Sequence, residues 1–215
     1  MSSGKSYLSR EIIKNMYDIC YSTQSFKETE VIFISKSHES SEQLSIICKE
    51  KKFKFQWWKI IHDFESIFTR ENTSKHTVIL FEDMSGLVNG SNSKFNAQMS
   101  QFLFRSRHHY ISLIYIMHGI SHSMTRKSSF ERIFLDNASG LFIFKPTNNA
   151  KVIYNYLKNF MKNETSKQID EIFELASKVS SHPYIFIQTN KQTKDDMNKI
   201  RIDIFKHNLF LQSGV

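Results

Sequence analysis

Two short motifs in the sequence carry residue types that can bind phosphate and a divalent cation. The first is Ser3-Gly4-Lys5-Ser6, the second half of the pattern GxxxxGK(S/T). In that pattern backbone N–H groups surround the phosphates, the lysine reaches the outer phosphates, and the serine contacts Mg²⁺. A helix must follow to complete the anion site, and apolar residues recur at helical spacing from Ser6 to Tyr21. The alternative interpretation is a polar segment whose serine caps a helix.

The second motif is the apolar run VILF at residues 78–81, which ends in Glu82 and Asp83. A buried strand with this ending can deliver one acid to the Mg²⁺ shell and the next to an attacking water. The alternative is a core strand that runs into an acidic turn. The order of the two motifs, with one strand expected between them, favours a single nucleotide site built from both.

A third group of residues surrounds the apolar run ISLIYIM at 111–117. Arg105 and Arg107 precede it, and an arginine ahead of a core strand can reach the γ-phosphate of a neighbouring subunit. His118 follows it, at the end of a strand where ligands bind in parallel sheets. The alternatives are a solvated helix end for the arginines and a surface position for the histidine.

Short apolar runs alternate with helical patterns along the whole chain. Strands are expected at 31–35, 77–81, 111–117, 140–145 and 184–188, with 201–205 as a sixth candidate. Helices are expected at 6–21, 39–51, 59–70, 95–104, 123–135, 148–162 and 166–179, while 52–58 fits either state. This alternation predicts an α/β fold in one domain over residues 1–215, with a mainly parallel sheet covered by helices on both faces.

The composition indicates a folded chain with a basic surface. The 215 residues are 40% hydrophobic and 13% aromatic, which argues against disorder and suits one domain with a real core. The net charge of +8 favours a polyanionic partner, with a basic surface kept for solubility as the alternative. Cys20 and Cys48 have no metal-type or disulfide-scaffold spacing. With no signal peptide and no apolar run near the roughly 18 residues of a membrane span, we expect a soluble intracellular protein without a membrane role.

Taken in order, these pieces resemble the FtsK–HerA branch of P-loop ATPases. More narrowly, they are similar to the DNA-packaging ATPases of large eukaryotic DNA viruses and of Polinton/Maverick and adintovirus-type elements. The resemblance is carried by SGKSYL (3–8), VILFEDM (78–84), SRHHYISLIYIMHG (106–119), NASGLFIFKP (137–146) and HPYIFIQTNKQTKDDMNKIRIDIF (182–205). It implies a P-loop NTPase of the ASCE/RecA-like type, a three-layer sandwich that lacks its first strand. Family members have a strand and a glycine before SGKS, so the sequence is expected to start within the Walker A loop.

The resemblance also implies ATP and Mg²⁺ as cofactors and assigns roles by position. The phosphate loop would comprise Ser3, Gly4, Lys5, Ser6 and Tyr7, and the hydroxyl of Ser6 would contact Mg²⁺. The remaining roles fall on Glu82 for Mg²⁺, Asp83 for the attacking water, Arg107 and then Arg105 as arginine finger, and His118 as sensor. Two residues depart from the family pattern, which usually has Asp in place of Glu82 and Gln in place of His118.

The function implied is an ATP-driven motor that works as a homo-oligomeric ring and moves double-stranded DNA into a preformed capsid. Its further partners would be capsid portal or vertex proteins, in the host nucleus, at a cytoplasmic virus assembly site or in the virion. Contacts to DNA phosphates are expected from Arg126, Lys127, Lys191, Lys194, Lys199 and Arg201, with plain solvated surface as the alternative. Two other functions remain open, an inactive remnant of such an ATPase and a small cellular nucleotide kinase.

Overall fold

The chain divides into two compact units, each with a sheet of its own. The computed structural model describes residues 4–20, 28–59, 75–82, 93–106, 109–117, 134–135, 137–138, 140–145, 150–158, 165–178, 184–188 and 202–203. One unit is formed by Lys5–Asp136, and the other by Asn137–Val215 together with Met1–Gly4. A four-stranded sheet lies in the first unit and a three-stranded sheet in the second.

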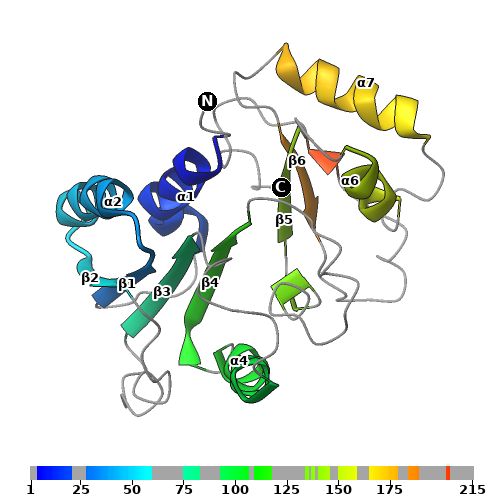
Figure 1. Ribbon diagram of the computed structural model, residues 1–215. Helices are drawn as coiled ribbons and strands as arrows, with labels where there is room; N and C mark the ends of the chain where they lie inside the picture. Colours follow the sequence, from blue (N-terminus) through cyan, green and yellow to red (C-terminus); the bar gives the residue numbers. More distant parts are fainter. Residues whose placement is uncertain are drawn as a thin grey trace. The chain divides into compact units, whose positions relative to one another are not determined.

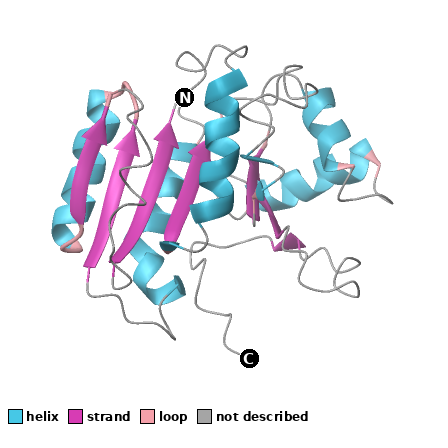
Figure 2. Cartoon of the chain, turned by 90° about the horizontal axis from the view of Figure 1, so that it is seen from below, coloured by secondary structure: helices cyan, strands magenta, loops and turns pink. Residues whose placement is uncertain are grey.

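The sheet of the first unit is parallel throughout. Its strands are β1 (Glu28–Ile34), β2 (Lys54–Trp58), β3 (Lys75–Glu82) and β4 (Ile111–Ile116), in the order β2-β1-β3-β4. Figure 2 shows the four strands running in one direction, and every neighbouring pair has parallel register. All residues of β3 after Lys75 are buried, and its centre is the continuous apolar run at 78–81.

Helices cover both faces of this sheet. Helices α1 (Lys5–Cys20) and α2 (His38–Glu50) lie on one face, and α4 (Ser93–Ser106) lies on the other (Figure 1). Alternate strand residues divide between the two faces. The face of α1 and α2 buries Val31, Phe33, Val78 and Leu80 with Ile13 and Leu44, and the face of α4 buries Ile32, Ile34, Ile79 and Phe81 with Met99 and Phe102. The predicted α/β class, with a parallel sheet between two helical layers, is confirmed for this unit.

The second unit is built differently. It contains β5 (Gly140–Phe144), α6 (Ala150–Leu157), α7 (Ser166–Ser177), β6 (Tyr184–Gln188) and β7 (Ile202–Asp203). The strand order is β5-β6-β7, and both pairs are antiparallel. Two helices separate β5 from β6, and the chain re-enters the sheet at the end where β5 leaves it, since Phe144 at the end of β5 is paired with Tyr184 at the start of β6. Its core contains Leu157, Ile169, Phe173 and Ile185.

Most predicted elements agree with the structure to within a few residues. Residues 52–58, which fit either a helix or a strand, contain the strand β2. The sixth strand, expected at 201–205, is limited to β7. Residues 60–70 of the helix expected at 59–70 lie outside the described residues, as does most of the helix expected at 123–135. Within the described parts of the chain, no helix has the length and apolar character needed to cross a membrane.

A buried histidine links β3 to β4 and makes stability depend on pH. The Nε2 atom of His76 lies 2.8 Å from Ser112 Oγ, and burial lowers the histidine pKa from 6.5 to about 4. The folded protein therefore excludes a proton that the unfolded chain accepts between these two values. The contribution of His76 to stability should be constant above pH 6.5 and should fall by up to about 3 kcal/mol as the pH drops to about 4.

Urea unfolding at a series of pH values tests this expectation. In a His76→Gln variant the free energy of unfolding should lose most of its dependence on pH in this range. A variant with the same pH dependence as the natural chain would contradict the assignment to His76.

Candidate functional site

The structure brings the two predicted phosphate-site motifs into contact. Ser6 lies in the first turn of α1, and Glu82 is the last residue of β3. The Ser6 hydroxyl donates a hydrogen bond to Oε1 of Glu82, across 76 positions of sequence. This contact lies at the carboxyl end of β3, the end where ligands bind in parallel α/β sheets.

The backbone before α1 has the conformation that the glycine of the first motif permits. Gly4 is buried and has a φ of 75°, in the left-handed region that costs energy for any residue with a Cβ atom. A side chain at this position would therefore disfavour the turn that leads into α1. The glycine of Ser3-Gly4-Lys5-Ser6 is explained by this local geometry, and Ser3 lies outside the described residues.

Lys5 occupies an electrostatically unfavourable position unless an anion is near it. It is the first residue of α1, where the helix dipole is positive, and the first turn contains no acidic residue. The side chain is half-buried, and this burial lowers the pKa of its ammonium group. Within the described parts of the chain no carboxylate pairs with it. The lysine and the N–H groups of the first turn together favour a bound anion such as phosphate.

Glu82, in contrast to Lys5, favours a bound cation. Glu82 as a whole is only 6% exposed, and its carboxylate accepts a hydrogen bond from Ser6. A buried carboxylate is costly unless a cation or several donors compensate it. Mg²⁺ typically takes one or two carboxylates together with substrate phosphates and waters, so the donor set of Ser6 and Glu82 fits this ion. The described residues hold no group of three or more His, Cys, Asp or Glu that could bind a metal by themselves.

A small pocket adjoins this contact. It lies between α1, α2 and the carboxyl halves of β1 and β3, and is lined by Ser6, Ser9, Arg10, Phe33, Ser40, Leu44, Leu80 and Glu82. Arg10 follows Ser6 by one helical turn, so it lies on the same side of α1 as Ser6 and adds a cation to the pocket. The sequence pattern gave no reason to select Arg10 or Ser40, because neither belongs to a motif. Their helical spacing and the position of α2 bring them here.

The remaining predicted residues are only partly described. Tyr7 is 45% exposed on α1 and does not line the pocket. Arg105 is exposed in the last turn of α4, just before β4 begins, whereas Glu82 lies at the opposite, carboxyl end of neighbouring β3. The structure therefore does not bring Arg105 to the Ser6–Glu82 contact. Asp83, Arg107 and His118 lie outside the described residues, as do all six predicted DNA contacts.

Comparison of the chain with protein-family models, with curated proteins and with solved structures found no match. What the site does must therefore be argued from its own residues and geometry.

Proposed function

We propose that this chain is a P-loop ATPase core that couples ATP hydrolysis to the movement of double-stranded DNA, as in the packaging of a viral genome into a capsid. The observation that carries the proposal is the hydrogen bond between Ser6 and Glu82. It joins a helix start of sequence Gly-Lys-Ser to the acidic end of a buried parallel strand. The parallel sheet with helices on both faces is compatible with this class of fold.

The roles of the residues follow from their positions. Lys5 and the first N–H groups of α1 would bind the outer phosphates of ATP and offset the charge that builds up on them. Ser6 and Glu82 would hold Mg²⁺, which supplies further electrostatic stabilisation of the phosphates when bound. Asp83 follows Glu82 directly and would orient or activate the attacking water.

The arginine finger would come from another copy of the chain. Arg105 lies toward the amino end of β4, away from Glu82 of the same chain, so it would have to act on a neighbour's nucleotide. Arg107 remains the first choice for this role from the sequence. A ring of subunits would satisfy this requirement, and DNA would be bound through its phosphates.

The test is ATP hydrolysis by the purified chain, with and without double-stranded DNA, beside a Lys5→Ala variant. We expect turnover that DNA stimulates and that falls by roughly 100- to 1,000-fold in the variant, because a preorganised cation at the phosphates is lost. A chain that is folded and binds nucleotide but never hydrolyses it would favour an inactive remnant instead. Transfer of phosphate to a nucleoside monophosphate would favour a nucleotide kinase.

A further inference from the structure

The turn between α2 and β2 carries the densest group of exposed cations in the described part of the first unit. Lys49, Lys51 and Lys52 lie within four positions, and all three side chains are exposed. None of them pairs with a carboxylate of the described residues. Glu50 is the single acid inside this stretch. We refer to Lys49, in the last turn of α2, together with Lys51 and Lys52 as the basic turn; it is found where α2 leads into β2 in Figure 1.

Helix termination explains the backbone of this turn but not all of its side chains. The N–H of Lys51 donates to Ile47 O, that of Lys52 to Lys49 O, and that of Phe53 to Cys48 O. Lysines near a helix C-terminus complement the dipole, which accounts for Lys49 and Lys51. Lys52, however, has a φ of 57°, at a position where glycine or asparagine is favoured. A side chain at this position therefore costs stability. Residues held in such a conformation are often functional, so we infer that the charge of Lys52 has a role in binding.

We propose that the basic turn is a contact site for the phosphate backbone of DNA. Its three ammonium groups match the charge of a polyanion, and β2 is the end strand of its sheet, so the adjoining edge is not paired with a described strand. Lysine contacts of this kind bind phosphates without reading sequence. The proposal rests on the proposed function for the choice of double-stranded DNA, and it assigns a surface that the six predicted DNA contacts do not include.

An anionic membrane surface is the other polyanion to consider, and the turn fits it less well. Basic segments that bind lipid surfaces firmly combine their charge with apolar side chains that enter the bilayer interface. The aromatic residues next to the turn face the core instead. Phe53 is 7% exposed, and Phe55 packs against the core under α1 and α2.

The experiment measures binding of the full chain to a fluorescein-labelled DNA duplex by anisotropy, without nucleotide, across a series of salt concentrations. The test variant carries Lys49→Gln, Lys51→Gln and Lys52→Gln. The matched control carries Lys151→Gln, Lys158→Gln and Lys178→Gln, three exposed lysines of the second unit. We expect the slope of log affinity against log salt to fall by about 3 in the test variant, about 1 for each lysine, and to stay unchanged in the control.

A single substitution at Lys52 separates the effect of the charge on DNA binding from the effect of the backbone conformation on stability. Lys52→Gly should raise the midpoint of thermal unfolding, because glycine suits the left-handed conformation, and should still lower the salt slope by about 1. An effect on binding that came only from damage to α2 would instead accompany a loss of stability.

The outcomes distinguish the two proposals. If the natural chain binds duplex DNA and the test variant binds it equally well, the proposal that the basic turn contacts DNA is wrong, while the proposed function stands. If the natural chain does not bind duplex DNA, the proposed function fails as well. Binding to phosphatidylserine vesicles that needs the three lysines, without binding to DNA, would overturn the choice of partner.

Discussion

Replacement of Glu82 by glutamine is expected to lower ATP turnover by roughly 100- to 1,000-fold without unfolding the protein. The amide oxygen of glutamine can still accept the hydrogen bond from Ser6, so the contact between α1 and β3 survives. The negative charge, which the proposed Mg²⁺ site requires, is lost. Because this side chain is only 6% exposed, an uncharged amide is also cheaper to bury, and stability should not decrease.

Two readouts make this prediction specific. The concentration of Mg²⁺ that gives half-maximal hydrolysis should rise in Glu82→Gln but not in Lys5→Ala, since only the first change touches the proposed metal site. Glu171→Gln, which removes an exposed carboxylate on α7, should leave turnover and Mg²⁺ dependence unchanged. Normal hydrolysis by Glu82→Gln would exclude the Ser6–Glu82 contact as the catalytic centre.

The parts of the fold that local patterns determine could be predicted from the sequence. Buried parallel strands give unbroken apolar runs, so β1, β3 and β4 are visible without tertiary information. The antiparallel sheet of the second unit was not foreseen. The signal was available, because two helices, rather than one, are expected between residues 140–145 and 184–188. Two helices can return the chain to the end of the sheet where the first strand stops, which makes the next strand antiparallel to it.

The residues of the candidate site that belong to sequence motifs could be predicted, and those that reach it through packing could not. Gly4 and Ser6 belong to one short motif and Glu82 to another, and the chemistry of phosphate and Mg²⁺ relates the two. Arg10 and Ser40 reach the pocket through the packing of α1 and α2, which no single motif encodes. The three charges of the basic turn are plain in the sequence, but the left-handed conformation of Lys52 is a property of the backbone.

The edge of β4 that faces away from β3 bears on the sheet expected from the family resemblance. This strand is apolar toward both helical layers, with Leu113 and Tyr115 packed on one core and Ile114 and Ile116 on the other. Such a pattern is typical of a strand inside a sheet. Yet β4 stands at the end of the order β2-β1-β3-β4, and no described strand of that sheet pairs with its second edge. An additional strand beside β4 would suit this pattern.

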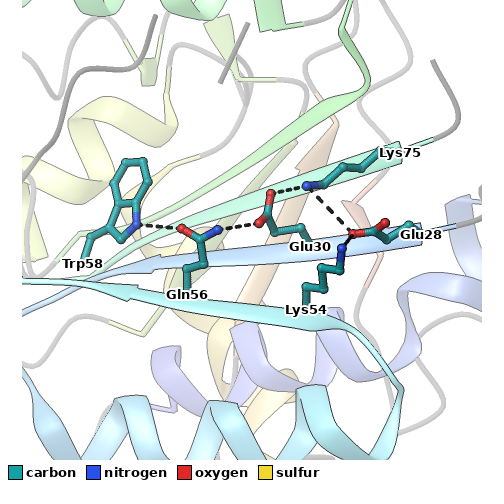
Figure 3. A network of polar contacts seen from close by, with 6 residues as sticks. All are labelled: Glu28, Glu30, Lys54, Gln56, Trp58 and Lys75. Carbon is teal, nitrogen blue, oxygen red and sulfur yellow. Dashed lines mark hydrogen bonds and ion pairs between the residues drawn. The ribbon is translucent and has the colours of Figure 1, made fainter. Parts of the chain in front are cut away.

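A buried ion pair at the amino end of the same sheet is expected to contribute strongly to stability. Figure 3 shows a polar network that joins β1, β2 and β3 and consists of Glu28, Glu30, Lys54, Gln56, Trp58 and Lys75. Within it Lys75 Nζ lies 2.7 Å from Glu30 Oε2, and the two side chains are 11% and 2% exposed. Gln56 Nε2 donates to the other carboxylate oxygen of Glu30 at 2.6 Å. Lys75 is therefore the cation that compensates a fully buried charge.

Substitution of Lys75 by methionine should lower the free energy of unfolding by about 3–5 kcal/mol, because the buried carboxylate of Glu30 then loses the ammonium group 2.7 Å from it. Lys54→Met is the matched control in the same network. Lys54 lies 2.5 Å from Glu28, but the two side chains are 65% and 32% exposed, so its loss should cost at most about 1 kcal/mol. Urea denaturation of the two variants measures both values.

A double substitution tests whether the cost arises from the unpaired charge. Glu30→Leu combined with Lys75→Met removes both charges, and it should recover most of the stability that Lys75→Met loses. If instead the double variant is less stable than Lys75→Met, the pair contributes through packing and register. Glu30 and Lys75 come from adjacent strands of a parallel sheet, where a one-residue slip would turn Lys75 to the face of α1 and α2. If the double variant does recover stability, the apolar cores on the two faces of the sheet are sufficient to hold that register.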